Sequence, residues 1–199
     1  MAGVTSSDDS MVDLNKLLNE FYDDPVGHSQ LGEFERASAI PDPYDRLLNH
    51  HAHMTVTVES YYGQPVDVHV HRHHRSDRWY AREITLVTSR SRRIVQYGIV
   101  RLKPEILAPE VWQRIENRET PLGRVLIDHN VMREVELSEL WRVEAGPSLA
   151  GLMHLRVGDR LYGRTALIHC DGVPTIELLE IIAPATNPQA NEPEETGHD

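Results

Sequence analysis

Three charged side chains are predicted on the apolar faces of β-strands, where a charge is costly. Side chains alternate between the two faces of a strand, and this alternation aligns Arg82 with Ile84 and Glu180 with Leu178. Arg164 shares its face with apolar neighbours in the same way. A buried charge persists when it is paired or used. Two hypotheses follow: an Arg–Glu ion pair inside the sheet, or a pocket in which arginines hold an anionic ligand and the glutamate exchanges a proton.

The segment TPLG (120–123) favours the pocket hypothesis. Thr120 is predicted to cap a helix and Pro121 to occupy its first position, which leaves the N–H groups of Leu122 and Gly123 free. Free amides at the start of a helix can bind an anion. Most such helix starts are only structural, so the segment supports an anion site only in combination with the charged residues of the strands.

The stretch VDVHVHRHHR suggests a different chemistry, because it gathers histidines. Alternation along a predicted strand places His69, His71 and His73 on its polar face. His53, on the preceding predicted strand, could pair with His71 or His73 and gather a metal ion. A solvated surface without a functional metal is the favoured interpretation. A nucleic-acid patch is disfavoured as well, because the arginines of this stretch do not segregate to one face.

Composition bounds the class of protein. The formal net charge of −11 comes mainly from acidic residues near the two ends, and the body between them is nearly neutral. The single cysteine, Cys170, excludes an intramolecular disulfide and a thiolate metal cluster. A polar, acidic opening segment and the lack of a long apolar run indicate a cytoplasmic protein without a signal peptide or membrane span.

The elements that must position these residues form an α+β domain. From residue 53 the apolar pattern has a period of two, with tight turns and one helical insertion. This order predicts a single antiparallel sheet of about six strands with helices on one side. The candidate strands span 53–61, 65–75, 79–89, 93–103, 132–143, 161–170 and 174–182. The candidate helices span 12–22, 44–50, 107–117 and 120–128.

Domain organisation is predicted from the same pattern. Residues 1–41 form a polar leader with one marginal helix, and residues 42–185 form the sheet domain. Residues 186–199 are rich in proline and acidic side chains and are predicted to be disordered.

Five segments, taken in order, resemble the bacterial chorismate pyruvate-lyases, and a divergent branch of that family most of all. They are HMT (53–55), YAREITL (80–86), ETPLGRVL (119–126), YGRTAL (162–167) and CDGVPTIELLEIIAP (170–184). The resemblance implies a six-stranded antiparallel sheet with helices enclosing a buried pocket. It also implies elimination of pyruvate from chorismate to give 4-hydroxybenzoate, without a metal or another cofactor.

The resemblance assigns roles to individual residues. Arg82 would bind the ring carboxylate, together with the Leu122 amide and the main chain at Met54, whose side chain would close the pocket. Glu180 would face the leaving enolpyruvyl oxygen and act as the acid or base. The better-known branch has an arginine where this chain has Ile99, and Arg164 or Arg101 could replace it.

Two further functions stay open. A related fold forms the effector domain of some bacterial repressors, so the chain could be a non-catalytic sensor of an aromatic carboxylate. Such a sensor normally carries a winged helix first, and residues 1–41 are too short and too polar for one. The chain could also be a lyase acting on another enol-ether carboxylate. The expected partners are small molecules, with neither nucleic acid nor membrane, and a monomer is favoured.

Overall fold

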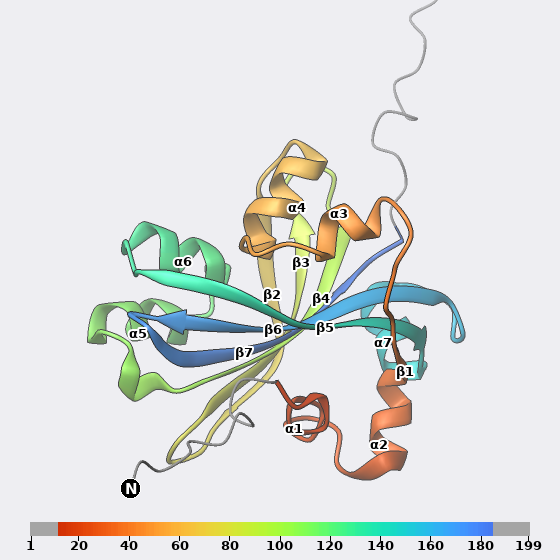
Figure 1. Ribbon diagram of the computed structural model, residues 1–199, viewed down its shortest axis with the longest axis horizontal. Helices are drawn as coiled ribbons and strands as arrows, with labels where there is room; N and C mark the ends of the chain where they lie inside the picture. The colour runs from red at the N-terminus through yellow and green to blue at the C-terminus, as the bar shows by residue number, and fades with distance from the viewer. Residues whose placement is uncertain (1–11, 185–199) are drawn as a thin grey trace, which may run out of the picture.

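The computed structural model describes residues 12–184 as an α+β domain built on one antiparallel sheet, as predicted. The sheet has seven strands in the order β1-β5-β6-β7-β4-β3-β2 (Figure 1). They are β1 (Gly32–Arg36), β2 (Val66–Arg75), β3 (Tyr80–Thr88), β4 (Ile94–Leu102), β5 (Arg133–Ala145), β6 (Arg160–Cys170) and β7 (Val173–Ile182). The strands fan out from a common centre in the view of Figure 1, which reflects the strong twist of the sheet.

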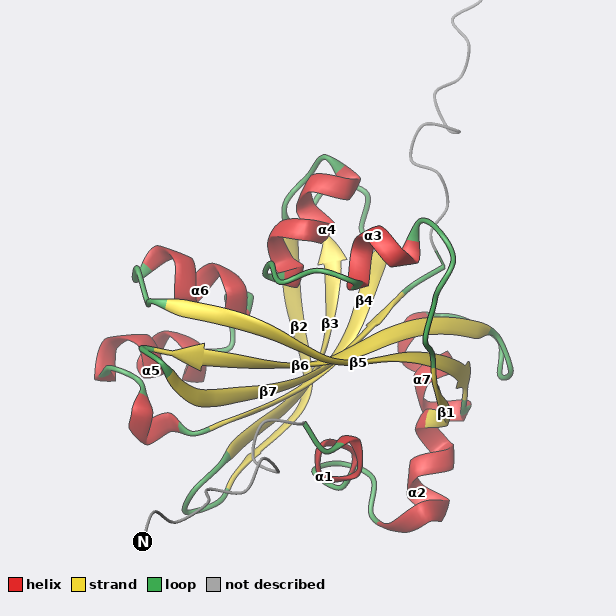
Figure 2. Cartoon of the chain, in the orientation of Figure 1, coloured by secondary structure: helices red, strands yellow, loops and turns green. Residues whose placement is uncertain are grey.

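Seven α-helices and one 3-10 turn, η1, accompany the sheet within the described residues (Figure 2). They are α1 (Leu14–Leu18), α2 (Asp24–Leu31), α3 (Tyr44–Leu48), α4 (Met54–Tyr62), η1 (Pro104–Ile106), α5 (Pro109–Glu116), α6 (Leu122–Asp128) and α7 (Pro147–Met153). The helices predicted over 44–50, 107–117 and 120–128 are confirmed as α3, α5 and α6. None of these helices is long and apolar enough to cross a membrane.

The strand predicted over 53–61 is wrong, because this segment forms helix α4. Its sequence alternates, but the buried side chains are Met54, Thr55 and Val58, which lie on one side of a helix. Val56, which alternation would bury, is 42% exposed. Gly63 ends the helix in the left-handed conformation that glycine adopts freely. The period of two in this short segment was therefore accidental.

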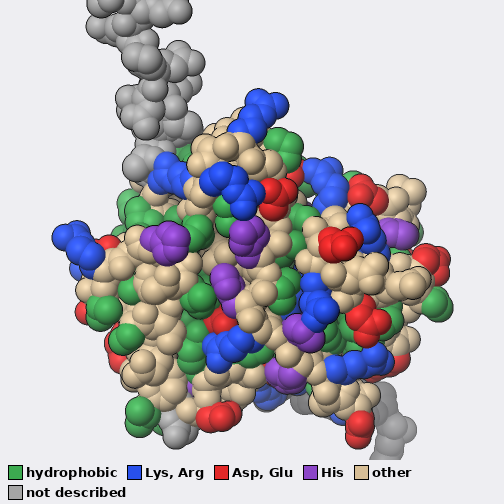
Figure 3. All heavy atoms as spheres, turned by 180° about the vertical axis from the view of Figure 1, so that it is seen from behind, with side chains coloured by type: hydrophobic (Ala, Val, Ile, Leu, Met, Phe, Trp, Pro, Cys, Tyr) green, Lys and Arg blue, Asp and Glu red, His purple; other side chains and the backbone are tan. Residues whose placement is uncertain are grey.

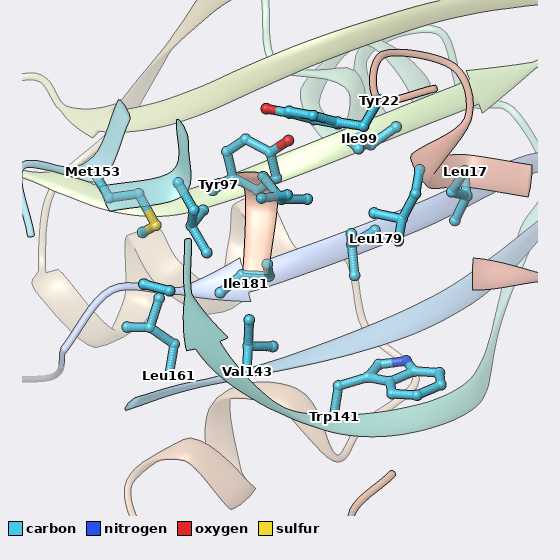
Figure 4. Close-up of a cluster of buried hydrophobic side chains, with 14 of the residues drawn as sticks. Leu17, Tyr22, Tyr97, Ile99, Trp141, Val143, Met153, Leu161, Leu179 and Ile181 are labelled. Carbon is cyan, nitrogen blue, oxygen red and sulfur yellow. The ribbon is translucent and has the colours of Figure 1, made fainter. Parts of the chain in front are cut away.

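The domain boundary predicted at residue 42 is also wrong. Within 12–41, strand β1 pairs with β5, and Leu17 and Leu18 of α1 are buried in the core. Figure 4 shows Leu17 packed beside Leu179 and Tyr22 above Ile99. The polar appearance of the segment hid the few apolar residues that dock it. The disordered tail predicted over 186–199 lies outside the described residues.

Helices cover both faces of the sheet, whereas the prediction placed them on one side. Helices α3, α4, α5 and α6 pack on the face that carries Arg82. Helices α1 and α7 pack on the other face, over Tyr97, Ile99 and Ile181. Strands such as IVQYGIVRL are apolar on both faces, which is typical of a strand buried on both sides.

The second face contains a buried polar group, Glu83, which alternation placed outside the core. Its Oε1 accepts hydrogen bonds of 2.6 Å from the hydroxyls of Tyr22 and Tyr97. Its Oε2 accepts one of 2.7 Å from Nε of Arg72. Burial opposes the charged form, but the bonds from Arg72, Tyr22 and Tyr97 outweigh it and lower the pKa of Glu83. The α1 segment is thus joined to the sheet by a polar contact as well as by leucines.

Docking of α1 is tested by Leu17→Ala. We expect the free energy of unfolding, measured by urea denaturation, to fall by about 2–4 kcal/mol because a fully buried side chain leaves a cavity. Lys16→Ala, at the exposed neighbouring position, is the control and should change it by less than about 0.5 kcal/mol. Equal effects of the two substitutions would show that α1 is not part of the core.

Candidate functional site

The strand register brings the three predicted charged residues to one face of the sheet. Glu180 lies opposite Gly98 on one side and Arg164 on the other. Arg82 lies opposite Val100, in the next row along the strands. Arg82, Arg164 and Glu180 therefore share one face, as alternation predicted. Arg164 and Glu180 are direct cross-strand neighbours, whereas Arg82 lies two strands away from Glu180.

A cavity of about 40 Å³ lies over these rows, between the starts of α4 and α6. Its walls are His53, Met54, Thr55, Ile84, Leu86, Gln96, Gly98, Val100, Leu122, Gly123, Val135, Arg164, Ile168, Leu178, Leu179 and Glu180. Such a volume holds a few water molecules, whereas an engineered protein cavity that admits benzene measures roughly 150 Å³. An organic ligand therefore requires movement of the walls, and the flexible Met54 side chain is suited to it.

Arg82 is a buried cation without a hydrogen-bond acceptor. Its side chain is 0% exposed, and none of its three guanidinium nitrogens has a partner among the described residues. Burial lowers the pKa of Arg82, and the Tyr80 hydroxyl lies near enough to favour the charged form without forming a well-aligned hydrogen bond. Val100 and Ile84, its neighbours on the sheet, line the cavity. Arg82 itself is not among the residues that line the cavity, and the bonding capacity of its guanidinium is unused.

Arg164 is equally buried, but its guanidinium is fully engaged. Its Nε donates to Oε2 of Glu180 at 2.7 Å, which is the Arg–Glu ion pair of the structural hypothesis. Its terminal nitrogens donate to the carbonyl oxygens of Leu48, His50 and Ala52 at 3.2, 2.8 and 3.2 Å. Arg164 lines the cavity, but its hydrogen bonds are made to other groups of the protein and leave little capacity for a ligand.

The starts of α4 and α6 meet at the wall of the cavity. A Cβ at Gly123 would come within 2.9 Å of the Thr55 hydroxyl, so the glycine permits this close approach. The predicted cap at Thr120 is wrong, because Pro121 itself precedes the helix and no side chain caps it. The Leu122 and Gly123 N–H groups still lie in the first turn, where no earlier turn of the helix accepts them.

His53 lies at the rim of the cavity, a position that its assignment to a strand concealed. It directly precedes α4, and its Nε2 accepts a hydrogen bond from Nε of Arg133. Burial, assisted by the charge of Arg133, lowers the pKa of His53 to about 4. The ring is therefore neutral near neutral pH.

A bulge at His71 divides the histidine row of β2. The register shifts there, so that His73 lies opposite Arg82. One inserted residue reverses the alternation of a strand. His73 therefore shares the face of Arg82, and the prediction that it lies on the same face as His69 is wrong.

The histidines do not converge on a metal. His53 lies on a helix start rather than on a strand beside β2, so the predicted cross-strand pairing with His71 or His73 is wrong. Arg118 donates to Nε2 of His73 instead. In Figure 3 several histidine side chains follow one another across the back of the molecule, with others apart from them. Within residues 12–184, no three His, Cys, Asp or Glu side chains are placed to hold a metal ion.

The position at which the better-known chorismate pyruvate-lyases have an arginine is buried away from the cavity. Ile99 packs on the opposite face of the sheet, beside Tyr97 and Leu179. Arg101 lies on that face too, over the Trp79 ring at 3.9 Å and paired with Glu20. Of the two arginines considered as replacements, Arg164 alone lines the cavity.

Comparison with known proteins gives a likeness of fold. No family model matches the chain, and no curated protein matches it. The ligand-binding domain of a putative GntR-family transcriptional regulator from Bordetella bronchiseptica is similar at 12% identity and a TM-score of 0.45, over 60% of this chain and 86% of that one. The possible transcriptional regulator YydK from Bacillus subtilis is similar at 11% identity and a TM-score of 0.45, over 63% of this chain and 59% of that one. The C-terminal domain of the histidine utilization repressor from Pseudomonas syringae is similar at 11% identity and a TM-score of 0.42, over 67% of this chain and 99% of that one. These likenesses are too distant to carry an argument about function.

The lowered pKa of His53 predicts acid sensitivity. The unfolded chain binds a proton at this residue near pH 6.5, whereas the folded protein does so near pH 4. The stability contributed by neutral His53 is therefore present above pH 6.5 and is lost as the pH falls to 4. We expect His53→Gln to reduce the fall in unfolding free energy between pH 6.5 and 4 by roughly 2 kcal/mol, allowing for partial exposure of the ring. His69→Gln, at an exposed site, is the control, and identical pH profiles for the two variants would contradict the assignment.

Proposed function

We propose that this domain binds a small carboxylic acid, with Arg82 as the partner of the carboxylate. The observation that carries the proposal is the unused guanidinium of a fully buried side chain. Buried polar groups are normally hydrogen-bonded, and an isolated buried charge is strongly destabilising. A ligand that supplies an anion removes this cost when it binds.

The surroundings of Arg82 favour an anion. His73 and Arg118 lie beyond it toward the surface, and neither supplies a negative charge. Tyr80, which interacts electrostatically with Arg82, has a hydroxyl that is also without a partner in the described residues. A guanidinium presents a planar fork that matches the two oxygens of a carboxylate.

The rest of the cavity favours a compact organic body. Ile84, Leu86, Val100 and Leu178 provide apolar walls, as in small-molecule sites in general. Gly98, which lies between Ile84 and Glu180 on the sheet, contributes no side chain to this part of the cavity wall. A ring-bearing acid fits such walls better than a flexible chain, since a rigid ligand loses less conformational entropy on binding.

A second candidate function is the elimination of pyruvate from chorismate. The observation that favours it is Glu180, which lines the cavity one row from Arg82. Its Oε2 is held by Arg164, whereas its Oε1 accepts only a long hydrogen bond of 3.5 Å from Gln96. Carboxylate binding is the preferred candidate because it requires only the unpaired guanidinium of Arg82. Chemistry also requires Glu180 to exchange a proton beside Arg164.

Binding is tested by Arg82→Met. Because the substitution removes an unpaired buried charge, we expect the free energy of unfolding to rise by roughly 1–3 kcal/mol while affinity for benzoate is lost. Calorimetric titration and urea denaturation measure the two effects. Arg164→Met is the matched control and should lower stability by roughly 3–5 kcal/mol, because it leaves Glu180 buried and unpaired. Benzoate affinity that survives in the Arg82→Met protein would contradict the proposal.

The elimination is tested by incubating the protein with chorismate and following pyruvate and 4-hydroxybenzoate separately. If the second function holds, both products form at equal rates, and Glu180→Gln lowers the rate about 100- to 10,000-fold while benzoate still binds. Arg101→Gln, on the other face of the sheet, should retain the parent rate. Product formation that is the same without the protein would exclude this function and leave the binding proposal intact.

A further inference from the structure

Gln96 is a buried polar residue whose role is not explained by the sheet. It lies on β4 opposite Leu86 and Ile182, is 3% exposed, and lines the cavity. Its amide nitrogen is 3.7 Å from the position of a Cβ on Gly98, so the side chain extends over the bare floor of the site. It therefore points into the cavity rather than into the surrounding core.

Gln96 and Arg82 lie on the same face of the sheet, two rows apart along the strands. Arg82 is in register with Val100, and Gln96 is four residues before Val100 on the same strand. Four residues of a strand span about 13 Å between main-chain positions. The row of Gly98 and Glu180 lies between them. A ligand whose carboxylate meets Arg82 thus directs its far end toward Gln96.

The hydrogen bonds of Gln96 leave one atom unused. Its Nε2 donates to Oε1 of Glu180 at a long 3.5 Å, and its Oε1 has no partner among the described residues. A carboxylate only accepts when ionised, so Glu180 fixes which end of the amide faces it. The atom without a partner is therefore Oε1 of Gln96, a hydrogen-bond acceptor, which a donor group of a ligand would satisfy.

We propose that Gln96 determines specificity at this site by accepting a hydrogen bond from a hydroxyl or amino group at the end of the ligand opposite its carboxylate. The inference rests on the proposed binding of a carboxylic acid and narrows it to ring acids that carry a donor across the ring. A ligand without the donor leaves the amide oxygen desolvated and unpaired, and a site built around such a bond rejects it.

The test compares two acids of similar shape, 4-hydroxybenzoate and 4-methylbenzoate, by calorimetric titration. The parent protein should bind the hydroxy acid at least about 10-fold more tightly, because a buried acceptor loses its partner in the methyl acid. 4-Aminobenzoate, which also donates, should share the preference. In Gln96→Met, which keeps an unbranched side chain without an acceptor, the two affinities should converge.

Controls separate this inference from the binding proposal. Gln113→Met makes the same change at an exposed position of α5 and should retain the parent preference. If Gln96→Met does not fold, Gln96→Asn withdraws the amide by one methylene and should also weaken the preference. Equal binding of both acids by the parent protein, or an unchanged preference in a folded Gln96 variant, would overturn the inference alone. Binding of none of the acids by the parent would overturn the proposed function as well.

Discussion

The guanidinium of Arg164 fixes the parts of the molecule from which the site is built. It grips Glu180 on the neighbouring strand and the carbonyl oxygens of Leu48, His50 and Ala52. These carbonyls belong to the connection from α3 to α4, so one side chain attaches this connection, and the start of α4 beyond it, to the sheet. A buried cation is tolerated here because nearly every donor has an acceptor. These bonds hold the wall of the cavity formed by His53 and Met54, together with the hydrogen bonds of His53 to Arg133 and of His51 to the Val135 carbonyl.

Arg82 and Arg164 show how far alternation along a strand can be trusted. Both are arginines in apolar strands, and alternation placed both on the correct face together with Glu180. It could not show that Arg164 is the arginine with partners and Arg82 the one without, because most partners of Arg164, apart from Glu180, are main-chain carbonyls distant in the sequence. Main-chain acceptors leave no trace in the types of side chain along a sequence. The ion-pair hypothesis therefore applies to Arg164 and Glu180, and the pocket hypothesis stays a prediction for Arg82.

The errors of sequence interpretation have physical causes that can be named. The segment 54–62 alternates over a few residues, too few to distinguish a strand from a helix whose contacts are decided by packing. The bulge at His71 leaves no mark in composition and moves His73 across the sheet. Gln96 escaped attention because a glutamine carries no charge, although its place among apolar residues of β4 was a usable signal. The second covered face was indicated by strands that carry apolar residues on both faces, such as IELLEII.

The small volume of the cavity bears on how fast a ligand can bind. At about 40 Å³ the site cannot admit a ring until its walls separate. Capture then depends on how often the starts of α4 and α6 move apart, and the observed rate should level off at high ligand concentration instead of rising in proportion to it. Once the walls close again, the same barrier delays escape. A domain of this construction would exchange its ligand slowly even at modest affinity.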